Sequence, residues 1–105
     1  MPLPPEIADL LNLPERGAGA PSLDAIESTL TTGYAAKLAL EAERWRIERR
    51  LGILARDAGE VTAHSVAAEL TELTGHLEAV DGELARLRSL LRKLQGVRHR
   101  RRAAA

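Results

Sequence analysis

The most regular pattern in the chain is a seam of aliphatic residues in its second half. From Val66 onward, apolar residues recur alternately four and three positions apart: Val66, Leu70, Leu73, Leu77, Val80, Leu84, Leu87, Leu91 and Leu94. This is the a/d spacing of a coiled-coil helix. Because one helix cannot bury such a seam alone, the pattern predicts a second helix packed against it.

A second heptad pattern precedes this seam. One of its columns holds Leu23, Leu30, Lys37, Arg44, Leu51 and Ala58, and the other holds Ile26, Gly33, Leu40, Ile47, Leu54 and Val61. The seam that the two columns form is apolar at both ends and positively charged near the middle, at Lys37 and Arg44. Ser22, or Asp24 with Glu27 in a capping box, suits the start of a helix. The pattern therefore predicts a long helix over about residues 22–57.

A turn is predicted between the two helices, at about residues 58–61. Gly59 has the position of a glycine that ends a helix, and Thr62 can cap the next helix, over about residues 62–97. The predicted fold is all-α, an antiparallel two-helix coiled-coil hairpin. A single continuous helix of about 75 residues, with Gly59 inside it, is the alternative.

The two seams fit each other in an antiparallel register. Facing positions in such a pair have a nearly constant sum of residue numbers, which here stays near 120. The facing pairs include Leu54 with Val66, Ile26 with Leu94, Arg50 with Glu69, Glu43 with His76, and Tyr34 with Arg88. The last pair is expected to place a cation over an aromatic ring.

One facing pair is unfavourable, because Glu41 and Asp81 carry like charges. Lys37 and Arg44 occupy the seam nearby. We expect their aliphatic stems to stay in the seam while their charged groups reach the two acids and relieve the repulsion.

The residues before the hairpin form two smaller parts. Residues 1–14 contain a short amphipathic helix in which Ile7, Leu10 and Leu11 share one face, and residues 15–21 have the composition of a flexible linker. Two roles stay open for this helix: it docks in a groove of a partner protein, or it caps the bundle of its own chain. The domain boundaries are thus 1–14, 15–21, a hairpin at 22–97 and a basic tail at 98–105.

A second apolar strip lies away from the seam of the first long helix, at Ala35, Leu38, Ala42 and Trp45. Trp45 is the only tryptophan, and exposed tryptophans are typical anchors of protein interfaces. The alternative is that Trp45 lies along Arg49 and Leu38 of its own helix. The residues expected to bind a partner are Ile7, Leu10 and Leu11 of the short helix, with Leu38 and Trp45 of the strip.

Small residues recur every seven positions opposite the leucine seam of the second long helix: Ala68, Gly75, Gly82, Ser89 and Gly96. A glycine inside a helix costs about 1 kcal/mol relative to alanine. We expect Gly75, Gly82 and Ser89 to form a self-association ridge, covered by Leu38 and Trp45 of a second copy in a dimeric four-helix bundle. Glycines without a function on a solvent face are one alternative, and a parallel dimer with Glu83 facing Arg88 is another.

Charge is distributed unevenly although the formal net charge is zero. All 15 acidic residues lie at or before Glu83, and eight of the 15 basic residues lie between Arg86 and Arg102. The arginines of the tail can contact an anionic partner, including nucleic acid without sequence specificity: Arg98, Arg100, Arg101 and Arg102. The alternative is that these cations only complement the carboxyl end of a helix.

The composition argues against metal binding, cofactor binding and catalysis. The 105 residues include no cysteine, and His64, His76 and His99 lack metal-ligand spacing. We expect no metal, no cofactor and no enzyme activity. The first residues do not resemble a signal peptide, and no apolar run approaches the roughly 20 residues that span a bilayer, so a cytoplasmic location is expected. The preference for arginine over lysine, with abundant alanine and leucine, suggests a bacterial genome.

The expected function is that of a non-enzymatic helical interaction or adaptor protein. Such a chain self-associates through its coiled-coil surfaces, with a homodimer as the expected assembly, and binds a protein partner. A small regulator that contacts nucleic acid, or a nucleic-acid-bound machine, through the basic tail is the alternative. A third possibility is a subunit that is stable only inside a larger complex.

Overall fold

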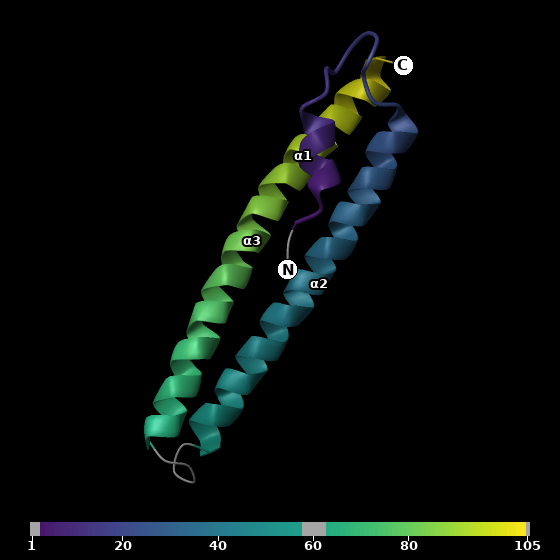
Figure 1. Ribbon diagram of the computed structural model, residues 1–105. Coiled ribbons are helices and arrows are strands. Elements are labelled where there is room, and N and C mark those ends of the chain that lie inside the picture. Colours follow the sequence, from purple (N-terminus) through teal and green to yellow (C-terminus); the bar gives the residue numbers. More distant parts are fainter. Residues whose placement is uncertain (1–2, 58–62, 105) are drawn as a thin grey trace.

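The computed structural model describes residues 3–57 and 63–104, and all the regular elements in these ranges are helices. They are α1 (Pro5–Leu11), α2 (Leu23–Asp57) and α3 (Ala63–Ala104). Helices α2 and α3 lie side by side and run antiparallel, and α1 contacts both near the start of α2 (Figure 1). The predicted helical hairpin is confirmed, and the alternative of one continuous helix is wrong.

The long helices account for the rod-like shape of the molecule, which measures 64 × 17 × 15 Å. Ser22 lies directly before helix α2 and caps it, because its Oγ accepts a hydrogen bond from the backbone N–H of Ala25 at 3.1 Å. This bond satisfies one of the amides that a helix leaves without a partner in its first turn. The predicted turn at 58–61, with Gly59 and the Thr62 cap, lies outside the described residues.

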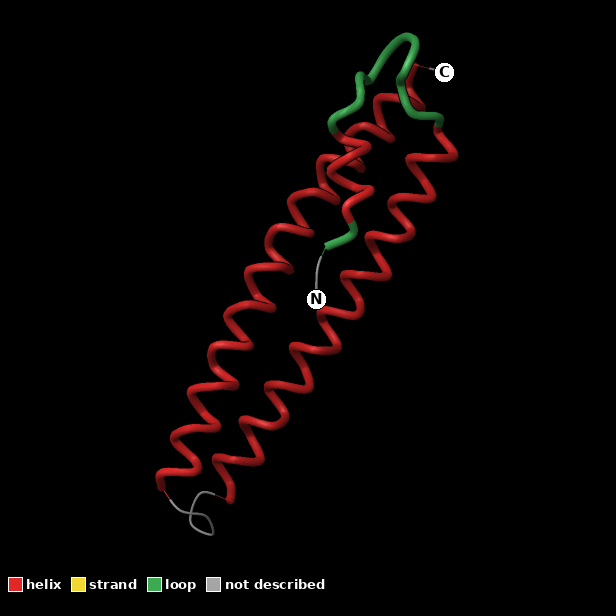
Figure 2. The backbone as a smooth tube through the Cα atoms, viewed as in Figure 1, coloured by secondary structure: helices red, strands yellow, loops and turns green. Residues whose placement is uncertain are grey.

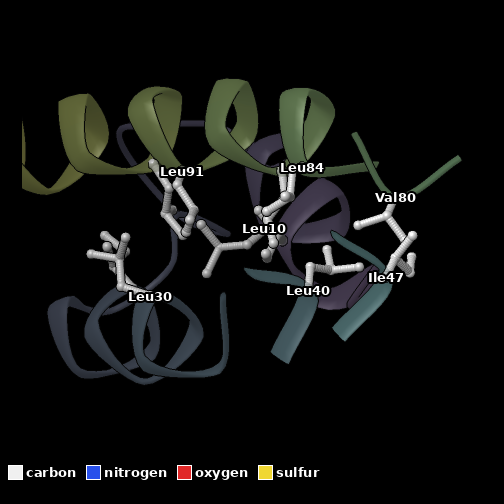
Figure 3. Close-up of a cluster of buried hydrophobic side chains, with 11 residues drawn as sticks. Leu10, Leu30, Leu40, Ile47, Val80, Leu84 and Leu91 are labelled. Atoms are coloured by element: carbon white, nitrogen blue, oxygen red, sulfur yellow. The ribbon is translucent and has the colours of Figure 1, made fainter. Parts of the chain in front are cut away.

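The predicted seam forms most of the core of the molecule, together with Ile7 and Leu10 of α1 (Figure 3). Before Val80 the predicted seam of α3 is half-buried or exposed. The buried seam residues of α2 are Ile26, Leu30, Gly33, Leu40, Ile47 and Leu54, and those of α3 are Val80, Leu84, Leu87, Leu91 and Leu94. Two flanking contacts confirm the register. Arg50 Nε donates to Glu69 Oε1 at 2.7 Å, and His76 Nε2 lies 3.6 Å from Glu43 Oε1.

The charged interruption of the seam has the arrangement that the sequence predicted. Arg44 Nε donates to Asp81 Oδ1 at 2.6 Å and its guanidinium also pairs with Glu48, while Lys37 Nζ lies 3.9 Å from Glu41. Both acids therefore have a cation beside them. The hydrogen bond to Asp81, followed by the charges of Asp81 and Glu48, raises the pKa of the Arg44 guanidinium.

Tyr34 corrects one prediction. Its hydroxyl oxygen accepts a hydrogen bond from Gln95 Nε2 at 2.6 Å, and among the described residues the cation–π contact involves Arg49 and Trp45 rather than Arg88 and Tyr34. Gln95 lies seven residues further along α3 than Arg88, the residue that the register placed opposite the ring.

Helix α1 lies against the hairpin at a gap that Gly33 opens in the seam. A Cβ atom at this position would lie 2.5 Å from Leu91 Cδ2 and 3.1 Å from Ile7 Cδ1. Ile7 is 0% exposed and Leu10 is buried. Of the two roles left open by the sequence, the structure shows the cap on the chain's own bundle (Figure 2).

The third helix is longer than predicted, because α3 continues to Ala104 instead of ending near residue 97. Two arginines of this extension pair with acids that precede or begin α2: Arg100 with Glu15, and Arg102 with Glu27. These contacts tie the last turns of α3 to the rest of the molecule, so the basic tail is a part of the hairpin.

Candidate interaction surfaces

The side of α2 that faces away from the seam is exposed along the whole helix. We call this face the outer strip. It consists of two heptad columns, Asp24, Thr31, Leu38, Trp45 and Gly52, and Ser28, Ala35, Ala42, Arg49 and Arg56, all of which are exposed. Leu38 is 67% exposed and Trp45 is 59% exposed, the highest values among the large exposed hydrophobic residues of the described chain.

Arg49 is the neighbour that partly covers Trp45. Its guanidinium carbon lies 5.3 Å from the centre of the indole ring, which is a cation–π distance. This is one half of the alternative arrangement considered for Trp45. Trp45 nevertheless keeps more than half of its surface in solvent, so the contact orients the side chain without burying it.

Charged residues flank the outer strip at its centre. Arg44, Glu48 and Asp81 form a linked set of ion pairs, and they line a shallow depression together with Trp45. Their charges are largely compensated within the set. The apolar surface of Trp45 and Leu38 therefore borders a polar rim, which is the usual composition of the edge of a protein interface.

The predicted self-association ridge of α3, at Gly75, Gly82 and Ser89, is called the glycine ridge below, and it is open at its centre. No heavy atom lies within 4 Å of the Cβ positions built on Gly75 and Gly82, and Ser89 is half-buried. At Gly96 the nearest such atom is Arg100 Nη1, at 3.2 Å. Nothing in the described part of the chain covers the two central glycines.

The four arginines of the predicted anion site are not equivalent. Arg100 donates from Nε and Nη2 to the two carboxylate oxygens of Glu15, at 3.0 and 2.6 Å, and Arg102 pairs with Glu27. The hydrogen bond from Arg100 lowers the pKa of the Glu15 carboxyl and raises the pKa of Arg100 itself. Arg98 and Arg101 are half-buried. Half of the predicted anion-binding set is thus engaged with acids of its own chain.

Sequence reasoning missed the acidic partners of these arginines. Glu27 lies one turn into α2, where the register sum near 120 places it opposite Lys93, nine residues before Arg102. Glu15 belongs to the segment before α2, whose path back over α3 has no signature in the heptad pattern.

The predicted partner-binding residues divide into two groups in space. Ile7 and Leu10 are buried and Leu11 is half-buried against the hairpin, whereas Leu38 and Trp45 are exposed on the outer strip. Only the second group is available to a partner while α1 stays docked.

The described ranges contain no cluster of three His, Cys, Asp or Glu side chains that is arranged to hold a metal ion. Nor does any helix within residues 3–57 and 63–104 have the length and apolar character that crossing a bilayer requires.

Comparisons with known proteins give no family and no relative. No protein-family model, no curated protein sequence and no solved structure matches the chain. Its function must therefore be inferred from its own surfaces.

Proposed function

We propose that this chain is a non-enzymatic helical interaction protein that self-associates and binds a protein partner. The observation that carries the proposal is the outer strip of α2, where Leu38 and Trp45 are 67% and 59% exposed. Both side chains lie away from the seam, so they do not contribute to the core of the hairpin.

Exposed side chains of this kind have a free-energy cost that an interface recovers. Removing apolar surface from water is favourable by roughly 25 cal/mol per Å². An interface gains the part of this free energy that exceeds the cost of association. Tryptophan is also enriched among the residues that dominate binding free energies. Two large apolar side chains about two turns apart, on a helix face of otherwise small or polar residues, form a compact anchor for another helix.

Because α1 is buried against the hairpin, the exposed outer strip of α2 is the better candidate for partner binding. Ile7 and Leu10 complete the core of their own hairpin, so partner binding through them would expose seam residues such as Leu91. The outer strip offers a contact that leaves the hairpin intact.

The proposal is tested with the 105-residue chain in which Leu38 and Trp45 are both replaced by glutamine. Light scattering at several concentrations is expected to give more than one chain mass for the unchanged protein and one chain mass, 11.4 kDa, for the variant. Leu13→Gln is the matched control, because Leu13 is also an exposed leucine but lies outside α2. A single chain mass for the unchanged protein at all concentrations contradicts self-association.

Partner binding has its own test, a pull-down with the same proteins as baits under nuclease treatment. A protein retained by the unchanged chain and by Leu13→Gln, but lost with the glutamine pair, supports the proposal. Equal retention by all three baits contradicts a role for the outer strip.

The alternative of a nucleic-acid-binding regulator is not part of the proposal. The ion pairs of Arg100 with Glu15 and of Arg102 with Glu27 withdraw positive charge from the surface that it would use. Aromatic residues for base stacking do not interleave the arginines either.

A further inference from the structure

We infer that the outer strip of α2 is a self-complementary dimer interface, in which the α2 helices of two copies pack antiparallel. The two-fold axis passes between Leu38 and Ala42 of the strip. The inference rests on the proposed self-association and names the surface and the register that produce it.

The positions of the outer strip and of the glycine ridge decide between two modes of pairing. Each lies on the side of its helix that faces away from the seam, and the seam lies between α2 and α3, so the two surfaces are on opposite edges of the hairpin. A contact of Trp45 with Gly82 of another copy would therefore use different edges on the two copies. Such heterologous contacts continue into open chains of molecules unless a rotation closes a ring.

A contact of the outer strip with itself closes with two copies. The same surface is used on both, as in the isologous interfaces of two-fold dimers. This geometry favours α2 against α2 over the four-helix bundle in which Trp45 lies on the glycine ridge.

The length of α2 suggests the register. The helix runs from Leu23 to Asp57, so two antiparallel copies overlap completely when facing residue numbers add up to 80. The facing pairs are then Asp24 with Arg56, Ser28 with Gly52, Thr31 with Arg49, Ala35 with Trp45, and Leu38 with Ala42. Each pair occurs twice in the dimer.

This register places every large apolar residue opposite a small one. Trp45 faces Ala35 and Leu38 faces Ala42, so the side chains fill the space that the alanines leave, as close packing requires. A shift by one heptad in one direction would instead place Leu38 opposite Arg49. A shift in the other direction would place Trp45 opposite Ser28 and shorten the overlap.

The ends of the same register are complementary in charge. Asp24 and Arg56 face each other at both ends of the interface, and within the described residues neither of them is in an ion pair of its own chain. Complementary charge at an interface contributes to its register and its specificity. One helix face is a small interface, so the dimer is expected to dissociate on dilution.

Cysteine cross-linking tests the register, since the chain has no cysteine of its own. In the variant Thr31→Cys/Arg49→Cys, each new cysteine faces its counterpart in the second copy. Within one chain the two are about 27 Å apart along the helix and cannot bond. A disulfide requires Cα atoms within about 7 Å, so oxidation is expected to give a covalent dimer.

The matched control is Thr31→Cys/Ala42→Cys, whose cysteines face each other only after a shift of one heptad. Both variants replace exposed residues, and circular dichroism checks that their helices are intact. Light scattering of the unchanged chain, run alongside, measures self-association separately.

Three outcomes are distinct. A dimer mass with cross-linking at 31 and 49 but not at 31 and 42 supports the inference. A dimer mass without cross-linking at 31 and 49, or with equal cross-linking in both variants, overturns the inference and leaves the proposed self-association standing. A single chain mass at every concentration overturns both.

Discussion

The two ends of the hairpin use the same seam with different results. Where α1 lies against it, Leu30 and Leu94 are at most 1% exposed. Toward the start of α3 the seam continues with the same spacing, but Leu70 is 37% exposed and Leu73 is only half-buried. One end is a three-helix core and the other is a pair of helices.

The difference shows what a two-helix seam cannot do. Each helix shields the other along one line, and both flanks of the seam stay open to water unless a third element covers one of them. Helix α1 supplies that cover over seven residues, and Gly33 lets it approach. Stability is therefore expected to concentrate at the α1 end.

Truncation of Ile7 is the strongest way to break this comparison. Ile7→Ala removes a fully buried side chain from the three-helix core, and such truncations cost about 2–5 kcal/mol of unfolding free energy. Leu70→Ala is the control at the other end. Because Leu70 is already partly exposed, we expect a loss of less than about 1.5 kcal/mol there, measured by denaturant unfolding. Equal losses at the two positions would mean that stability is not concentrated at the α1 end.

Leucine substitutions at two glycines give the next largest contrast. Gly33→Leu places a side chain where Ile7 and Leu91 already meet, and overpacking of this kind costs about 1–3 kcal/mol. Gly82→Leu places its side chain in open space on α3. Replacing a glycine inside a helix by leucine stabilises the helix by up to about 1 kcal/mol. Thermal unfolding is expected to shift in opposite directions.

The same Gly82→Leu variant separates the two modes of self-association. If α2 pairs with α2, its mass by light scattering is unchanged. A lower mass would return the glycine ridge to the interface.

The sequence was sufficient for the parts of the molecule that depend on spacing alone. The seams of α2 and α3, the pairing of Arg50 with Glu69 and the reach of Arg44 to Asp81 follow from heptad positions in an antiparallel register. The exposure of Leu38 and Trp45 agrees with their positions off the seam.

The remaining features depend on where a separate segment goes. The site of α1 required reading Gly33 as a gap in the seam, and a glycine at a seam position does not say which side chain fills it. The predicted length of α3 was too short because the prediction followed the seam, whose last residue is Leu94. The helix continues to Ala104, and in this extension Arg100 pairs with Glu15 and Arg102 pairs with Glu27. The full outer strip was missed because most of its positions are small or polar.

Exchanging the charges of Asp24 and Arg56 tests how the two ends of the hairpin meet in the proposed dimer. There the α1 end of one copy would lie beside the open end of the other. Asp24→Arg is expected to raise the dimer Kd a few-fold, because exposed ion pairs contribute about 0.2–1 kcal/mol each and two are lost. Asp24→Arg/Arg56→Asp restores the pairing with reversed signs and should recover most of the affinity by sedimentation. Both variants carry arginine at position 24, so the recovery cannot come from the helix dipole. Failure of the double exchange to recover affinity argues against the register.

The smallest expected effect is an acid sensitivity confined to the α1 end. The hydrogen bond from Arg100 lowers the folded-state pKa of Glu15 below its usual 4.5. As the pH falls below 4.5, Glu15 takes up a proton in the unfolded chain before it does so in the folded chain. The stability that this pair contributes at neutral pH is therefore lost as the pH falls toward and through the lower folded-state pKa. Glu15→Gln should therefore flatten the fall in melting temperature below pH 4.5. Glu78→Gln is the control, because it makes the same substitution at an exposed position of α3 away from Arg100. Identical profiles for all three proteins would show that the Arg100–Glu15 contact does not hold the segment before α2 in place.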